Sequence, residues 1–126
     1  MGMTKTDLLE RTFEYSGRVI SLYGKSAHNE VGHVLGKQLL RSGTSIGANV
    51  HESQAAQSKA DFISKISIAY KEAIETIYWL RLISVQQLIE ENYLNELLDE
   101  TSQLSKILSS ILLSSKQTLT AKNLHS

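Results

Sequence analysis

Residues 30–57, EVGHVLGKQLLRSGTSIGANVHESQAAQ, contain the pattern that decides the fold, a row of glycines within a segment of helical periodicity. Drawn as a helix of about 100° per residue, the segment places these glycines within about 60° of one another. Each interior glycine costs a helix about 1 kcal/mol relative to alanine, so a row on one face indicates close approach of a neighbouring helix. The row consists of Gly32, Gly36, Gly43 and Gly47.

A break within this segment is the competing interpretation. Ser42-Gly43-Thr44 has the composition of a turn, and a turn there would divide the segment into a helix-turn-helix. The chain contains no proline to force such a break, and periodicity by itself leaves both possibilities open.

Three other segments have amphipathic helical periodicity. The apolar stripe of the first contains Leu8, Tyr15, Val19, Leu22 and Tyr23, widened by Leu9, Phe13 and Ile20. The third opens at Ser58, with Asp61 three residues later as in a capping box. We predict helices over residues of about 5–23, 30–57, 59–90 and 93–118. Their short connections favour an all-α, antiparallel, up-down-up-down four-helix bundle, formed by a single domain of residues 1–126.

The composition is that of an ordinary globular protein: 126 residues, 41% of them apolar and 21% charged, with 13 basic and 13 acidic side chains. The absence of cysteine excludes disulfides and thiolate metal sites. No window approaches the roughly 18 apolar residues of a membrane span, and the N-terminal residues lack the apolar block of a signal peptide. We therefore expect a cytoplasmic protein that is not attached to a membrane.

No arrangement of residues predicts catalysis. Gly24-Lys25-Ser26 resembles the end of a phosphate-binding loop, but it lacks the earlier glycine and follows a helix instead of a strand. Glu30 and His33 have the spacing of a di-iron ligand pair, but no second such pair exists. No fixed spacing joins a serine nucleophile to a base. The sequence predicts no enzymatic activity, metal, cofactor or small-molecule substrate.

The N-terminal half of the chain is mildly basic. Residues 1–60 contain seven bases and five acids, and self-association would gather these bases into a stronger patch for RNA phosphates. The candidate RNA-binding residues are Arg11, Arg18, Lys25, Lys37, Arg41 and Lys59.

An acidic stretch follows later in the chain. Between Arg81 and Lys106 there is no base, and the acids there are Glu90, Glu91, Glu96, Asp99 and Glu100. This stretch would be the contact face if the protein were instead a protein–protein adaptor without nucleic-acid binding.

Polar residues recur at steps of three and four along the second predicted helix and gather again on the third. They are Ser42, Ser45, Asn49 and Glu52, followed by Lys71, Glu72 and Glu75. We expect them to bond across helices and fix the register of the bundle, with a ligand site as the alternative role. Trp79 lies among charged residues, opposite the apolar stripe of the third helix, and this position predicts a contact between subunits.

The run RSGTSIGANVHESQAAQSKADFISKISIAYKEAIETIYWLRLI, residues 41–83, resembles the four-helix bundle proteins encoded by intervening sequences in bacterial 23S rRNA genes. The matching residues of the second helix are Arg41, Ser45, Ile46, Asn49 and Glu52. Those of the third helix are Asp61, Phe62, Lys65, Lys71, Glu72, Ala73, Glu75, Thr76, Tyr78, Trp79 and Leu80. The match covers about a third of the chain, and the helix layout agrees over nearly all of it.

This resemblance implies that the second helix runs unbroken through Gly43. The family is similar in fold to the accessory protein of diversity-generating retroelements, a pentameric barrel that associates with nucleic acid. A homo-oligomer, specifically a pentamer, without enzymatic activity is therefore implied for this chain. The retroelement protein is strongly basic, whereas this chain has no net charge. We expect a binding or scaffold protein with RNA, ribosomal RNA in the first place, as its ligand.

Overall fold

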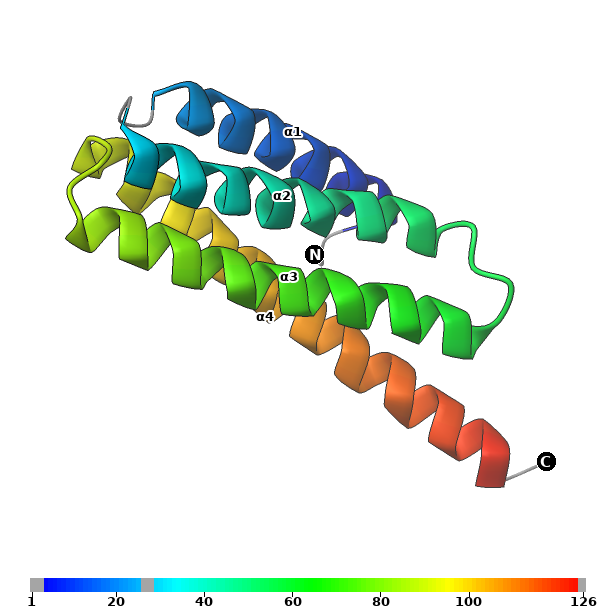
Figure 1. Cartoon of the computed structure of the whole chain (residues 1–126). Helices are drawn as coiled ribbons and strands as arrows, with labels where there is room; N and C mark the ends of the chain where they lie inside the picture. Colours follow the sequence, from blue (N-terminus) through cyan, green and yellow to red (C-terminus); the bar gives the residue numbers. More distant parts are fainter. Residues whose placement is uncertain (1–3, 26–28, 125–126) are drawn as a thin grey trace.

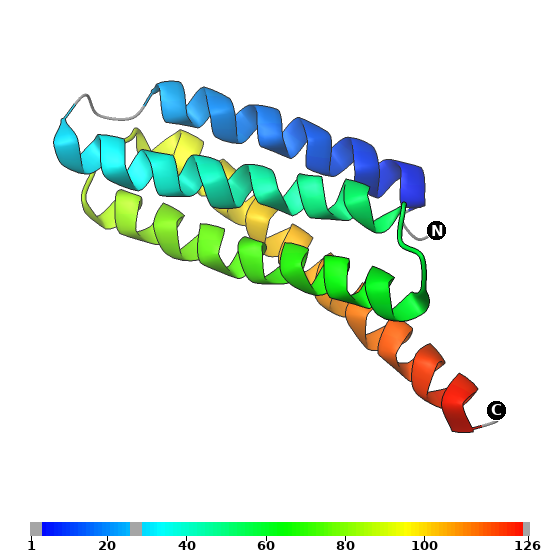
Figure 2. The same ribbon diagram turned by 45° about the vertical axis from the view of Figure 1, so that its right-hand side comes forward.

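The computed structural model describes residues 4–25 and 29–124, with the side chains of 123 and 124 excepted, and this part of the chain is helical without strands. Its helices are α1 (Lys5–Gly24), α2 (Glu30–Ser53), α3 (Lys59–Val85) and α4 (Glu91–Leu124) (Figure 1). The colour gradient reverses direction from each helix to the next in both views, so consecutive helices run antiparallel (Figures 1 and 2). The predicted all-α four-helix bundle is confirmed.

Two predicted helix ends were wrong, and α4 is longer than predicted. α2 ends at Ser53 instead of 57, and Ser58 caps α3 by accepting a hydrogen bond from the Asp61 N–H at 3.0 Å. α3 ends at Val85 instead of 90. Gln87, two residues after the helix end, takes a left-handed backbone conformation with φ of 54°. α4 begins at 91 and continues to 124, beyond the predicted 118.

α2 is continuous through Gly43, which excludes the helix-turn-helix. Gly43 and Gly47 face α1, as the row on one side of the helix predicts. A Cβ built on Gly43 would lie 2.8 Å from Val19 of α1, and one on Gly47 would lie 3.0 Å from the carbonyl oxygen of Thr12. Both distances are shorter than ordinary van der Waals contact, so any side chain at either position would push α1 and α2 apart.

The core lies along the axis between the four helices. Among its fully buried members are Tyr15, Leu39, Ile46, Ile66, Leu80, Leu104 and Leu108. The Tyr15 hydroxyl is hydrogen-bonded to the hydroxyl of Thr101 on α4, and burial raises the pKa of Tyr15. The stripe predicted for α1 is narrower than expected, since Phe13 and Ile20 are 73% and 56% exposed. They lie on the side of α1 that faces away from its helix neighbours.

We expect Gly47→Leu to lower the free energy of unfolding by about 3 kcal/mol or more, because its Cβ would overlap the α1 backbone at Thr12. Gly17→Leu is the matched control, since a Cβ at this exposed position has nothing within 4 Å. The control should raise stability by up to about 1 kcal/mol through helix propensity. Urea unfolding followed by circular dichroism measures both, and equal stability of the two variants would refute the close packing.

Candidate binding surfaces

An arginine-centred cluster joins the outer faces of α2 and α3. Arg41 donates one hydrogen bond to Glu72 at 3.0 Å and another to Glu75. The Trp79 indole N–H donates to the same Glu75 carboxylate at 3.0 Å. Trp79 is half-buried and packs partly on the core, so it lies less far outward than the sequence predicted. We call these residues the Arg41 cluster: Arg41, Glu72, Glu75 and Trp79.

The other polar residues of α2 that were expected to fix the register of the bundle divide into two groups. Ser42 and Glu52 reach α3, where the Thr76 hydroxyl donates to Ser42 at 2.9 Å and Lys65 lies 3.9 Å from Glu52. Ser45 and Asn49 instead donate to carbonyl groups one turn earlier in α2. Lys71 is exposed and forms no ion pair with a described residue. Ser42 and Glu52 therefore help to fix the register of α2 on α3, whereas Ser45, Asn49 and Lys71 form no described contact between helices.

α1 and α4 are the neighbouring helices with the least mutual contact, and an arginine of α1 joins them in addition to the buried Tyr15–Thr101 contact. The Arg11 guanidinium donates to both carboxylate oxygens of Glu100 at 2.7 Å and to Gln103 at 2.8 Å. The side chains of Arg11 and Glu100 are only 25% and 18% exposed. The hydrogen bonds to Glu100 raise the pKa of Arg11, which keeps the charge on the guanidinium.

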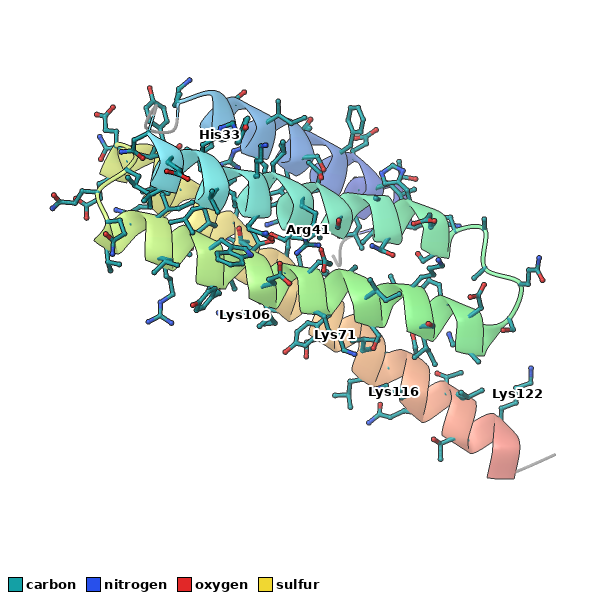
Figure 3. All side chains as sticks on the ribbon, in the orientation of Figure 1. His33, Arg41, Lys71, Lys106, Lys116 and Lys122 are labelled. Atoms are coloured by element: carbon teal, nitrogen blue, oxygen red, sulfur yellow. The ribbon has the colours of Figure 1, made fainter. Side chains whose placement is uncertain are left out.

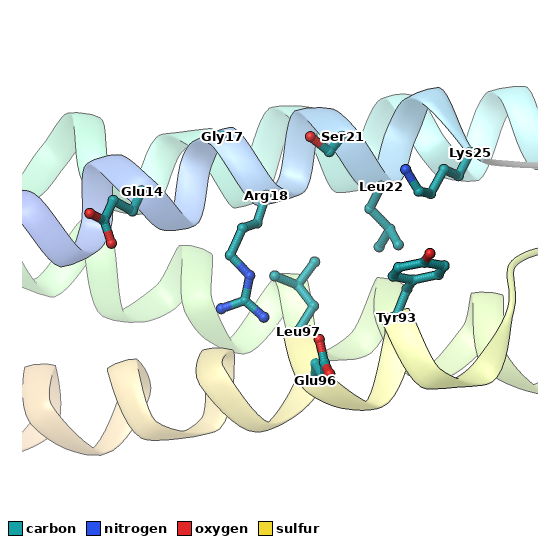
Figure 4. Close-up of a pocket in the computed structure, with 9 residues that line it drawn as sticks. All are labelled: Glu14, Gly17, Arg18, Ser21, Leu22, Lys25, Tyr93, Glu96 and Leu97. Atoms are coloured by element: carbon teal, nitrogen blue, oxygen red, sulfur yellow. The ribbon is translucent and has the colours of Figure 1, made fainter.

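A cavity of about 320 Å³ lies beside this pair, between α1 and α4 (Figure 4). In Figure 4 the Arg18 side chain extends from α1 toward Leu97 and Glu96 of α4. The Lys25 ammonium lies 5.3 Å from the centre of the Tyr93 ring. Arg18 and Lys25 of α1 thus lie opposite Glu96 and Tyr93 of α4 along this seam.

The six predicted RNA-binding residues do not form one surface. Arg11, Arg18 and Lys25 follow the α1–α4 seam, whereas Arg41 belongs to the Arg41 cluster of α2 and α3. Lys37 is exposed on α2. Lys59, at the start of α3, lies 5.5 Å from the Phe62 ring centre. The pairing of Arg11 and Arg41 with carboxylates could not be foreseen, because each partner lies at least 31 residues away in sequence.

An exposed stripe on α3 was missed as a candidate site by the sequence analysis. Lys71, Ile74, Tyr78 and Arg81 recur at steps of three and four and are all exposed, with Tyr78 59% accessible. Within the described ranges neither base forms an ion pair. We call these residues the α3 stripe. The spacing of its bases around an aromatic residue was the signal that could have identified it.

Within residues 4–25 and 29–122, no group of three His, Asp or Glu side chains could hold a metal ion. His33 has Nδ1 3.5 Å from the Tyr23 hydroxyl, and their rings lie 6.3 Å apart. In the same part of the chain, no helix has the length and apolar character needed to cross a membrane.

The comparison with known proteins gives the family. Residues 4–110 match the 23S rRNA-intervening sequence protein family. The chain belongs to this family. A solved structure of a protein with unknown function from the S23 ribosomal protein family of Bacteroides thetaiotaomicron VPI-5482 is 40% identical, with a TM-score of 0.78. The alignment covers 83% of this chain and 97% of that one. No curated protein matches the chain.

Membership confirms the resemblance carried by residues 41–83. The family match ends within α4, so the last helical residues, 111–124, extend beyond it. The Arg41 cluster and the α3 stripe both lie inside the matched region.

We expect Arg11→Met to lower the free energy of unfolding by about 2 kcal/mol, because it leaves the mostly buried Glu100 carboxylate without its partner. Arg18→Met is the control, since Arg18 is exposed and forms no ion pair within the described residues. The control should change stability by less than about 0.5 kcal/mol. A smaller loss for Arg11→Met than for Arg18→Met in urea unfolding would contradict the role of this pair.

Proposed function

We propose that the protein is a cytoplasmic, homo-oligomeric scaffold without enzymatic activity that binds RNA through the α3 stripe. The observation that carries this proposal is the exposed, unpaired pair of bases Lys71 and Arg81 on either side of Tyr78. Bases of this kind neutralise phosphates, and an exposed tyrosine ring provides a surface on which a nucleobase stacks. The description of the family as rRNA-intervening sequence proteins makes structured ribosomal RNA the first ligand to test.

The charge balance of the chain makes such a local site necessary. With 13 bases and 13 acids, the protein has no overall field that would attract RNA. Some bases are already neutralised within the fold, as Arg11 is by Glu100 and Arg41 by Glu72 and Glu75. RNA binding therefore depends on bases that remain free, and on self-association to repeat the stripe in several copies.

Exposed apolar side chains on α3 support self-association. Ile68 is 41% exposed beside the Arg41 cluster, and Val85 near the end of the helix is 72% exposed. Trp79 lies between Ile68 and Val85 along the helix. Its ring is in edge-to-face contact with the Tyr78 ring, and the two ring centroids are 5.1 Å apart. We propose that the side of α3 that bears Ile68 and Trp79, which lies roughly 100° around the helix from the α3 stripe, forms the subunit contact, in a pentamer as the family resemblance implies.

RNA binding should weaken steeply with salt if phosphates are contacted. We expect Lys71→Gln/Arg81→Gln to reduce the slope of log affinity against log salt by about 1.5 for a structured ribosomal RNA fragment. Lys106→Gln/Lys122→Gln removes the same charge from exposed positions on α4 and should leave the slope nearly unchanged (Figure 3). Filter binding at several salt concentrations measures both.

Two results would count against this proposal. Equal effects of the two double variants would mean that RNA senses only net charge. Absence of binding at low salt would favour an adaptor that binds a protein through the acidic stretch, where Glu90, Glu91, Glu96 and Asp99 are exposed. Glu100 would not be available to such a partner, because Arg11 occupies it.

We expect Trp79→Ala to reduce the oligomer mass in light scattering while changing the helix content of the subunit little. Phe13→Ala is the control, because Phe13 is the most exposed large apolar side chain of α1 and lies away from α3. A full oligomer mass together with a lower melting temperature for Trp79→Ala would show that the indole serves only the packing of its own subunit.

A further inference from the structure

A second candidate site lies at the end of the bundle where α1 and α3 begin and α2 ends. A cavity of about 560 Å³, which we call the end cavity, opens there between all four helices. α4 diverges from the other helices toward this end and continues past them (Figures 1 and 2). Because α4 leaves at an angle, it covers this end of the other three helices only in part.

The interior of the end cavity is mainly apolar, with Ser53, Gln54 and Ser58 as its uncharged polar lining. Its floor is formed by Leu8, Val50 and Ile66 from α1, α2 and α3, each no more than 8% exposed. Phe62 and Ile111, both half-buried, complete the walls. A neighbouring cavity of about 430 Å³ between α1 and α4 shares Leu8 and Ile111 with it, so the apolar surface extends along the α1–α4 seam.

The rim of these cavities is cationic. Lys5 and Lys59 line the end cavity, and Lys106 lines its neighbour. No carboxylate is among the described residues that line either one. The nearby acids Asp7 and Asp61 accept hydrogen bonds from backbone N–H groups of the helix caps, at 3.1 and 3.2 Å.

Two helix N-termini add to this positive rim, since α1 and α3 both begin beside the cavity. Helix dipoles place partial positive charge at these ends, which favours an anion over a cation or a neutral group. The Lys59 ammonium is held over the Phe62 ring, at the boundary between the charged rim and the apolar wall.

We propose that the end cavity binds a single-chain fatty carboxylate, with the hydrocarbon chain on Leu8, Val50 and Ile66 and the carboxylate at the lysine rim. The volume lies within the range of about 300–1,000 Å³ that is usual for small-molecule sites. A chain of this kind removes apolar surface from water and places its one charge where the cavity is cationic. The proposal is independent of RNA binding, because the α3 stripe contributes no residue to the cavity.

The test is isothermal titration of the full chain with dodecanoate, below the concentration at which it forms micelles. We expect saturable binding of one molecule per chain, and at least tenfold weaker binding of dodecyltrimethylammonium, which has the same chain with a positive head. Lys59→Gln/Lys106→Gln should weaken dodecanoate binding about tenfold. Lys37→Gln/Lys122→Gln, which removes two exposed bases that line neither cavity, should change it by less than twofold.

Location is tested with Ala56→Phe, which places a ring in the cavity from a connecting residue outside the helices. This variant should retain its circular dichroism spectrum and lose dodecanoate binding. In the unsubstituted protein, dodecanoate should shift the methyl resonances of Val50 and Ile66. Equal affinity for the anionic and cationic chains would overturn the proposal. So would absence of dodecanoate binding together with a lower oligomer mass for Ala56→Phe, which would assign the cavity to a second copy of the chain.

Discussion

The contact between α1 and α2 at Gly43 and Gly47 is the constraint on which the rest of the bundle depends. A Cβ at 47 would lie 3.0 Å from a backbone carbonyl of α1, so the two helices approach more closely here than a residue with a side chain would allow without a shift. α2 then presents its other side to α3, with the buried hydroxyls of Ser42 and Thr76 and the Arg41 cluster setting the register. The helix-propensity cost of Gly43 and Gly47 is therefore offset by the close packing that they allow.

The side of α1 that faces α4 is packed less closely than the side that faces α2. α1 and α4 contact each other less than the other neighbouring helices do, and α4 diverges from the bundle toward its C-terminal end (Figure 1). Tyr15 with Thr101, and Arg11 with Glu100, are the polar contacts that join the two helices. The same looseness leaves the cavity around Arg18 and the lysine-rimmed end cavity. The side of α1 that faces α2 is thus closely packed, whereas the side that faces α4 leaves cavities.

The distribution of charge connects this architecture to function. A chain without net charge has no bases in surplus, so each base held by a carboxylate within the fold is lost to a partner. Arg11 and Arg41 are held in this way, whereas Lys71 and Arg81 of the α3 stripe are free of ion pairs in the described part of the chain. The binding role proposed for this member of the 23S rRNA-intervening sequence protein family therefore rests on a small exposed surface of α3, which the proposed self-association would repeat.

The sequence by itself determined the four helices, the glycine face of α2, the Ser58 cap and the family, because these depend on periodicity and local hydrogen bonding. It did not determine where α2 and α3 end, since their last turns compete with the caps and turns that follow. Tertiary structure alone decided which charges are free. Arg11 meets Glu100 across 89 positions of sequence, and this pairing depends on how α4 packs against α1. The cavities have the same origin, because the angle of α4 is set by side-chain packing between helices and not by any local pattern.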